Sequence, residues 1–116
     1  KALDAGYRWT RDGGATYPWR GRGLTIPTLE EALAAFPNVP LAIEIKQVVP
    51  EIADRVVDLL EQYDAIDRTV LASFDRRPVG RVRELQPQML TAFTSQELVT
   101  LGVAEPGMTP PYAPPA

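Results

Sequence analysis

Glu44 and Lys46 are the two residues whose types and spacing most directly suggest chemistry. They lie in the run 41–46, Leu-Ala-Ile-Glu-Ile-Lys, which is typical of a β-strand. Because successive side chains of a strand alternate between its faces, both should project from one face, about 7 Å apart. A carboxylate suits a hard cation such as Ca²⁺ or Mg²⁺, and a neighbouring lysine suits an anionic group. A structural ion pair is the competing interpretation.

Other side chains give weaker signals. Five side chains in the glycine-rich first 25 residues could contact a phosphate, a polyol or a substrate ring: Arg8, Trp9, Trp19, Arg20 and Arg22. Solvated arginines, and tryptophans that pack a loop together, are the commoner cases. Ser73 and Thr91 could face the same strand ends as Glu44, but ordinary packing is the favoured interpretation.

Composition limits the classes of function. The 116 residues are 45% apolar and 23% charged, which is typical of a globular chain. The net charge of −3 gives no reason to expect nucleic acid or an anionic membrane as a partner, and no apolar run approaches the length of a membrane span. Without cysteine the chain holds neither a disulfide nor a thiolate metal site. Without histidine, any histidine-based acid–base mechanism must take that residue from outside this chain.

Short apolar runs alternate with amphipathic helices after residue 26. Helices are predicted over 28–36, from 50 onward, over 78–85 and after 94, and strands over 41–46, 69–74 and 89–93. Two of the helix starts fit a capping box, Thr28 with Glu31 and Thr94 with Glu97. The first 25 residues show neither the helical nor the strand spacing of apolar residues. They predict a loop with a turn at its Asp-Gly-Gly sequence.

The helix that begins at residue 50 has a clear amphipathic pattern. Its apolar stripe consists of Ile52, Val56, Leu59 and Leu60 at helical spacing. The opposite face carries charged residues, among them Asp54, and is expected to be solvated.

The element order α, β, α, β, α, β, α predicts an α/β fold with about three parallel strands and flanking helices. The near-continuous apolar run 69–74 is typical of a strand covered on both faces. A (β/α)₈ barrel of TIM type and an open doubly wound sheet both have this alternation. A whole barrel needs about 250 residues, so this chain could supply only a partial one. In both architectures ligands bind at the carboxyl ends of the strands, where Glu44 and Lys46 are expected.

Two stretches together resemble the glycerophosphodiester phosphodiesterase family. Residues 23–31, Gly-Leu-Thr-Ile-Pro-Thr-Leu-Glu-Glu, match the family's typical helix start, and residues 41–46 match the strand that follows it and ends in Glu-Ile-Lys. Residues 12–21 are similar to the insertion that often precedes these motifs, and residues 70–74 look like the family's next strand. The resemblance covers residues 2–101, and the two main motifs at this spacing are fairly specific.

The resemblance implies the barrel rather than the open sheet, and a metal-dependent enzyme that hydrolyses glycerophosphodiesters to glycerol 3-phosphate and an alcohol. Carried over to this sequence, Glu44 is a ligand of the divalent cation, Ca²⁺ or Mg²⁺, and Lys46 binds near the substrate phosphate. The family's His-Arg, Glu-x-Asp and His-Asp motifs normally lie on the three preceding strands and are absent here. The chain is therefore expected to be an internal fragment with no catalytic residue of its own, inactive by itself.

The resemblance also sets the expected domain organisation. Residues 1–103 are predicted to form the partial barrel domain, in which residues 1–25 are a loop insertion at the barrel mouth. Residues 104–116 are predicted to be a proline-rich tail without regular structure. The chain begins at Lys1 without an initiator methionine, and both of its ends are expected to be cut or processed. Cytoplasmic and periplasmic or extracellular locations are both compatible with the sequence.

Two other functions fit the same pattern. A phospholipase D-like enzyme or a phosphoinositide-specific lyase would have a related barrel and would differ in its upstream metal ligands and mouth loops. A non-catalytic α/β module, which binds a phosphoester or a partner protein, would have a neighbouring sequence that lacks the His-Arg and His-Asp pairs.

Overall fold

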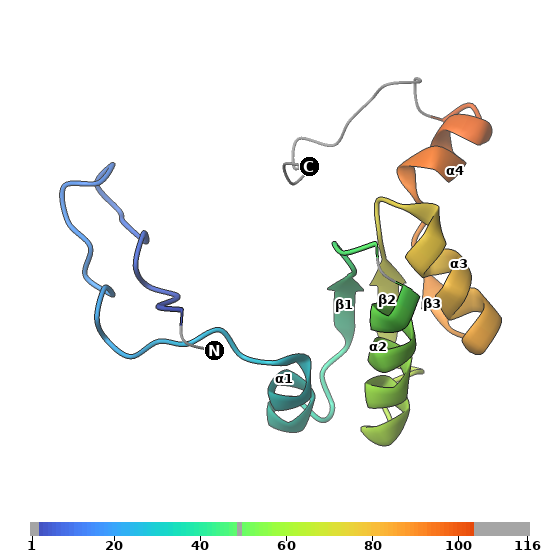
Figure 1. Cartoon of the computed structure of the whole chain (residues 1–116), viewed down its shortest axis with the longest axis horizontal. Coiled ribbons are helices and arrows are strands. Elements are labelled where there is room, and N and C mark those ends of the chain that lie inside the picture. Colours follow the sequence, from blue (N-terminus) through green and yellow to red (C-terminus); the bar gives the residue numbers. More distant parts are fainter. Residues whose placement is uncertain (1–2, 49, 104–116) are drawn as a thin grey trace. The chain divides into compact units, whose positions relative to one another are not determined.

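The computed structural model describes residues 3–48 and 50–103, which form parts of two compact units, Lys1–Ala35 and Phe36–Ala116. The first unit ends in α1 (Leu29–Ala35). The described part of the predicted loop, residues 3–25, contains no helix and one isolated bridge, between Asp4 and Thr25. The second unit contains β1 (Leu41–Glu44), α2 (Pro50–Gln62), β2 (Thr69–Ala72), α3 (Arg76–Leu85), β3 (Leu90–Thr91) and α4 (Ser95–Thr100) (Figure 1). The predicted proline-rich tail lies outside the described residues.

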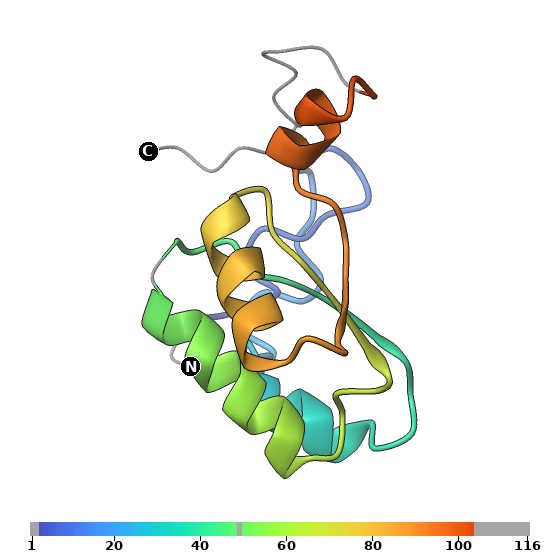
Figure 2. The ribbon, with the colours of Figure 1, turned by 90° about the vertical axis from the view of Figure 1, so that its right-hand side faces the viewer.

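The three strands form one parallel sheet in the order β1-β2-β3. Glu44 pairs with Ala72 across the first ladder, and Val70 pairs with Leu90 across the second. The connecting helices α2 and α3 pack against each other beside the sheet (Figures 1 and 2). The predicted α/β fold with three parallel strands and flanking helices is confirmed. A segment of a barrel and one half of an open doubly wound sheet share this arrangement.

One face of the sheet is buried and the other is open. The core of the second unit contains these apolar side chains: Ile45, Ala53, Val57, Leu59, Leu60, Ala65, Leu71, Val79, Val82 and Met89. On the other face Ala42, Val70 and Leu90 form a row across the three strands, and Val70 and Leu90 are 39% and 64% exposed. The expectation that the run 69–74 is covered on both faces is therefore wrong for the described residues. β2 carries apolar side chains on each face, Leu71 on one and Val70 on the other, but the described elements cover only the face of Leu71.

Both predicted capping boxes are present. At α1 the Glu31 N–H donates to Thr28 Oγ1 over 3.1 Å, and the Thr28 N–H donates to Glu31 Oε2 over 2.8 Å. At α4 the Glu97 N–H donates to Thr94 Oγ1 over 3.2 Å, and the Thr94 N–H donates to Glu97 Oε2 over 2.7 Å. Each box satisfies backbone donors that a helix start leaves without an intrahelical partner.

Several boundaries differ from those predicted, because side chains replace the backbone ladder at the strand ends. β1 and β2 each end two residues early: the Ile45 N–H still bonds to Ala72 O over 2.8 Å, but the next acceptor, Ile45 O, receives the Ser73 hydroxyl. β3 is also shorter, with two residues instead of five. α3 begins two residues early because Asp75 caps it and accepts the Arg77 N–H over 2.8 Å.

The buried stripe of α2 matches the predicted one in part, because Leu59 and Leu60 are buried as predicted. Ala53 and Val57 are buried, whereas Ile52 and Val56 are half-buried. Asp54, expected to be solvated, keeps 44% of its side chain exposed and also pairs with the Arg81 side chain of α3. Arg81 Nε lies 2.6 Å from Asp54 Oδ1, and Arg81 Nη2 lies 3.0 Å from Oδ2. This hydrogen bonding lowers the pKa of Asp54, and the pair links the two helices.

Candidate functional site

Glu44 and Lys46 form an ion pair at the carboxyl end of β1. Lys46 Nζ donates to Glu44 Oε1 over 2.7 Å, and the side chains of Lys46 and Glu44 are 44% and 35% exposed. Ile45 between them is 4% exposed, which confirms that Glu44 and Lys46 share the open face. The two charged groups are therefore much closer together than the separation of about 7 Å expected along a strand. The sequence alternation therefore places the two charges correctly, and the structure adds their direct contact.

Two residues after β2 fix the segment that carries this pair. Ser73 Oγ donates to Ile45 O over 2.8 Å and is buried, so the favoured interpretation of Ser73 as a packing residue is confirmed. Lys46 Nζ lies 4.7 Å from the centre of the Phe74 ring, a cation–π distance. The lysine is thus held by a carboxylate at the end of β1 and by an aromatic face just after the end of β2.

A single carboxylate limits what this site can bind. The oxygens of Glu44 are of the type that Ca²⁺ and Mg²⁺ prefer. Within residues 3–48 and 50–103 no group of three acidic, histidine or cysteine side chains could hold a metal ion. The Lys46 ammonium beside Glu44 opposes a bare cation by like-charge repulsion. The pair is therefore not by itself a cation site within the described residues.

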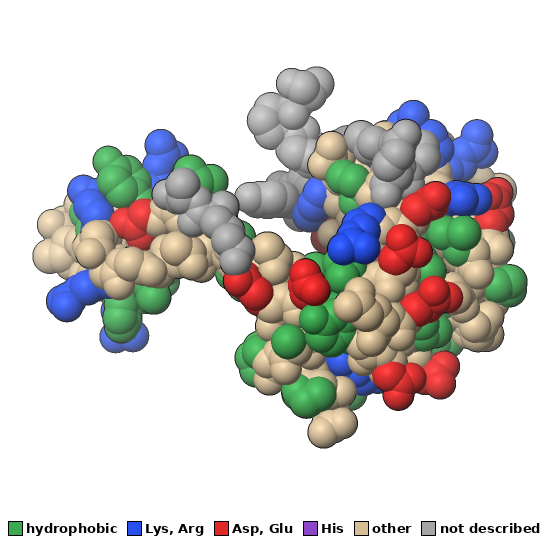
Figure 3. Space-filling view, turned by 60° about the horizontal axis from the view of Figure 1, so that its bottom comes forward, with side chains coloured by type: hydrophobic (Ala, Val, Ile, Leu, Met, Phe, Trp, Pro, Cys, Tyr) green, Lys and Arg blue, Asp and Glu red, His purple; other side chains and the backbone are tan. Residues whose placement is uncertain are grey.

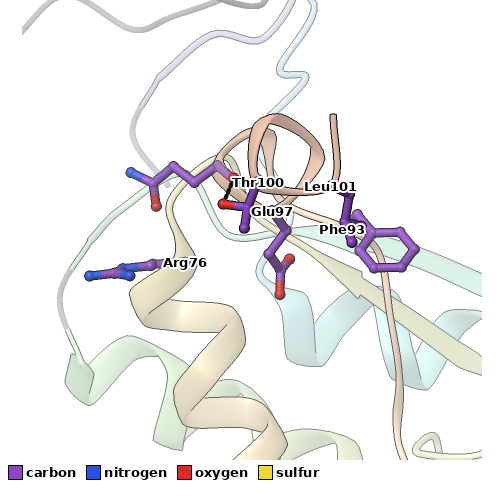
Figure 4. Close-up of a pocket in the computed structure, with 6 residues that line it drawn as sticks. Arg76, Phe93, Glu97, Thr100 and Leu101 are labelled. Carbon is purple, nitrogen blue, oxygen red and sulfur yellow. Dashed lines mark hydrogen bonds between the residues drawn. The ribbon is translucent and has the colours of Figure 1, made fainter. Parts of the chain in front are cut away.

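A pocket of about 270 Å³ lies near the start of α3 and beside α4 (Figure 4). Its lining residues are Arg76, Phe93, Gln96, Glu97, Thr100 and Leu101. Arg83 and the Thr94 N–H donate to Glu97 and hold its pKa at about 2, so this carboxylate is no general acid at neutral pH. Glu44 and Lys46 do not line this pocket, which offers an arginine and apolar side chains without a catalytic pair.

Thr91 faces α3 rather than the open face of the sheet. Its Oγ1 accepts a hydrogen bond from Arg83 Nε over 2.9 Å. The favoured interpretation of Thr91 as a packing residue is confirmed.

The stretch of residues 3–25, which we name the aromatic lobe, uses two of the predicted arginines for its own structure. The Arg20 guanidinium stacks on Tyr7 and Tyr17 at 4.4 and 3.9 Å from their ring centres, and its Nε donates to Tyr7 O over 2.9 Å. Arg22 Nε donates to Pro18 O over 3.3 Å. These two arginines therefore hold turns of the lobe together.

Sequence reasoning missed two residues of the lobe. Arg11 lies 5.3 Å from the Trp9 ring centre and lines, together with Trp9 and Trp19, a pocket of about 500 Å³. Asp4 accepts hydrogen bonds from the N–H groups of Gly6 and Gly21 over 2.9 and 2.8 Å. An aspartate two residues before a glycine is a known turn signal and could have identified Asp4. Arg8, the remaining predicted arginine, is exposed.

Comparison with known proteins gives partial matches. No family model matches the chain, and no solved structure matches it. An uncharacterized protein of Mycobacterium tuberculosis, Rv2277c, is 34% identical over 73 residues, which cover 61% of this chain and 24% of that protein. Lysophospholipase D GDPD3 of Mus musculus is 30% identical over 67 residues, which cover 58% of this chain and 20% of that enzyme. The chain thus spans a quarter or less of the length of these relatives.

Proposed function

We propose that this chain is an internal segment of a metal-dependent glycerophosphodiester phosphodiesterase, which forms glycerol 3-phosphate and an alcohol. The observation that carries the proposal is the contact of Glu44 with Lys46 at the carboxyl end of a parallel strand. The motifs at residues 23–31 and 41–46 and the partial match to the mouse lysophospholipase D support the same enzyme class.

Each of the two side chains has a proposed role. Glu44 would hold Ca²⁺ or Mg²⁺, and Lys46 Nζ would contact the substrate phosphate. A bound cation supplies neutralisation of the negative charge that develops on the phosphoryl oxygens. Lys46 could leave Glu44 for a phosphate oxygen because its stem is flexible and its side chain is 44% exposed. The general acid and base must come from other segments, so the chain alone is proposed to be inactive.

The open face of the sheet supports the partial barrel. Ala42, Val70 and Leu90 lie on the same face as Glu44, at alternate positions of their strands. In a closed (β/α)₈ barrel this face points inward and is covered by the remaining strands. The greater length of the relatives supplies enough residues for those strands.

The first test is the coding sequence upstream of Lys1. About a hundred codons, the share of a barrel that three strands and their helices require, should encode His-Arg, Glu-x-Asp and His-Asp in that order. A barrel start without the histidines would overturn the enzyme and favour the non-catalytic binding module.

The second test is turnover in the longer protein. Glu44→Gln should raise the concentration of Mg²⁺ or Ca²⁺ needed for glycerol 3-phosphate release, and Lys46→Met should lower kcat by about a hundredfold or more. Asp58→Asn, an exposed carboxylate on α2, is the matched control and should leave both quantities unchanged. Near-normal activity and metal dependence in Glu44→Gln would contradict the assignment.

A further inference from the structure

The aromatic lobe carries its apolar side chains on the outside. Among residues 3–25 only Gly6 is buried. Large apolar side chains of the lobe are 40–69% exposed: Leu3, Tyr7, Trp9, Trp19 and Leu24. Trp9 and Trp19 contact each other edge to face, with ring centres 6.3 Å apart, so neither lies in a core. The two tryptophans thus pack against each other within the lobe, and each keeps 40–47% of its surface exposed.

Polar groups fix the shape of the lobe instead. Both carboxylate oxygens of Asp4 accept backbone N–H groups, and the Ala5 N–H donates to Leu24 O over 2.8 Å. Asp12 accepts hydrogen bonds from Thr10 and Thr16, which lower its pKa and keep it ionised. Because these bonds close the lobe, its exposed rings are available to an outside surface.

Charge separates the lobe from the rest of the chain. Residues 1–25 contain five basic and two acidic side chains, and residues 26–116 contain seven basic and thirteen acidic ones. The whole-chain charge of −3 thus combines a segment of +3 with a segment of −6. Figure 3 shows basic side chains interspersed with hydrophobic ones on the lobe, at the left of the view. A whole-chain net charge hides this local pattern.

We propose that the aromatic lobe docks on an anionic lipid surface. Trp9, Trp19 and Leu24 would enter the boundary between headgroups and acyl chains, where indole rings are favoured. Arg8 and Arg11 would contact lipid phosphates. Arg11 lies beside the Trp9 ring in the pocket of about 500 Å³, so cationic and apolar groups meet the same layer of the surface. This inference stands independently of the phosphodiesterase activity.

The same features disfavour two other ligands. A quaternary ammonium group would be repelled by Arg11 at the mouth of the tryptophan pair. Single-stranded nucleic acid needs ring faces on which bases stack, whereas the planes of Trp9 and Trp19 meet at 70°. Leu24, an exposed leucine that lines the same pocket as the two rings, has no partner among bases but suits acyl chains.

Intrinsic fluorescence tests the proposal directly, because both tryptophans of the chain lie in the lobe. The chain is titrated with vesicles of phosphatidylglycerol and phosphatidylcholine, with pure phosphatidylcholine vesicles and with a single-stranded oligonucleotide. We expect a blue shift with the anionic vesicles alone, quenching by brominated acyl chains, and weaker binding at higher salt. The quenching distinguishes insertion of the lobe from adsorption through the open face of the sheet.

Variants separate the apolar and the charged contributions. Trp9→Ala with Trp19→Ala, and Arg8→Gln with Arg11→Gln, should each weaken sedimentation with anionic vesicles by about tenfold. Phe36→Ala and Arg55→Gln, an exposed ring and an exposed arginine outside the lobe, should bind as wild type.

Three results would overturn the inference: no spectral shift with anionic vesicles, equal binding to neutral vesicles, or a shift with the oligonucleotide alone. The titration of the unaltered chain decides the question even where a variant fails to fold.

Discussion

The aromatic lobe and the sheet-containing unit keep their shapes by opposite means. The sheet unit buries apolar side chains such as Leu60, Leu71 and Val82 completely. The lobe, residues 3–25, buries none, and is closed by the carboxylates of Asp4 and Asp12. Burial of a leucine or valine contributes about 1.5–3 kcal/mol, whereas a net hydrogen bond contributes about 0.5–1.5 kcal/mol.

Because of this difference, apolar side chains have different roles in the two regions. In the sheet unit the apolar side chains are the source of stability, so few of them can be changed without loss. In the lobe, hydrogen bonds to polar groups set much of the conformation, and the large apolar side chains remain largely at the surface. Substitutions of apolar residues should therefore affect unfolding in one region and surface binding in the other.

The largest effect is expected from a cavity in the sheet unit. Leu71 is fully buried in the central strand β2. Leu71→Ala should lower the free energy of unfolding by about 2–5 kcal/mol, because it removes apolar contacts and leaves a cavity. Urea unfolding of the dilute chain, followed by far-ultraviolet circular dichroism, measures this change.

Trp9→Ala is the matched substitution in the lobe. It removes a larger side chain, yet the unfolding free energy of the sheet unit should change by less than about 0.5 kcal/mol, because the ring lies at the surface. Equal losses for Trp9→Ala and Leu71→Ala would show that the two regions are not stabilised differently.

Local patterns explain how much of the structure the sequence predicts. Each capping box joins two residues three positions apart, and the shared face of Glu44 and Lys46 follows from strand alternation. Both features are therefore visible in a short stretch of sequence. Pairs far apart along the chain are not visible in this way. The Asp54–Arg81 contact spans 27 residues, and the bond from Gly21 to Asp4 spans 17.

In the candidate site, too, local features could be predicted and contacts between distant residues could not. Sequence alternation places the two charges at a strand end, but the cation–π contact of Lys46 depends on Phe74, which follows the neighbouring strand β2. Whether the open face of the sheet is covered depends on residues beyond this chain's described elements. The exposed lobe surface was missed because tryptophan in a loop predicts packing by default, and only coordinates show which rings are buried.

The next largest effect is expected from a methyl group inside the lobe. A Cβ at Gly6 would lie 2.4 Å from Trp19 O and 2.7 Å from Trp19 Cβ, so the backbone must move. Gly6→Ala should weaken closure of the lobe by about 1–3 kcal/mol. The amides of Ala5 and Gly21 should then exchange faster with solvent, while the unfolding of the sheet unit stays constant. Unchanged exchange at both amides would contradict the tight contact.

A smaller effect is expected at the ion pair that joins α3 to α4. Glu97 accepts from Arg83 and from the Thr94 N–H, which lower its pKa from 4.5 to about 2. A carboxylate whose pKa is lower in the folded than in the unfolded state stabilises the fold at pH values above its unfolded-state pKa. This stabilisation is lost as the pH falls toward the pKa of the folded state. Glu97→Gln should therefore lower stability by about 1 kcal/mol at pH 7.

The pH dependence of this loss is the sharper measurement. The difference between wild type and Glu97→Gln should shrink steadily from about pH 4.5 to pH 2, because the wild-type carboxylate becomes protonated there. Unfolding by urea at several pH values measures the difference, and other carboxylates cancel because both proteins carry them. A difference that is constant over this range would contradict the pairing of Glu97.

The smallest effect is expected at Gly80, where a substitution should raise the stability instead of lowering it. Gly80 lies inside α3, and a Cβ built there meets no atom within 4 Å. Gly80→Ala adds the same methyl group as Gly6→Ala, but it restricts the unfolded chain without a clash, so stability should rise by about 0.5–1 kcal/mol. A higher urea midpoint for Gly80→Ala, beside faster lobe exchange for Gly6→Ala, would show that local space decides the sign. If Gly80→Ala were destabilising, α3 would have to pack against something that the described residues do not include, and the sheet unit would be less open than its exposed faces indicate.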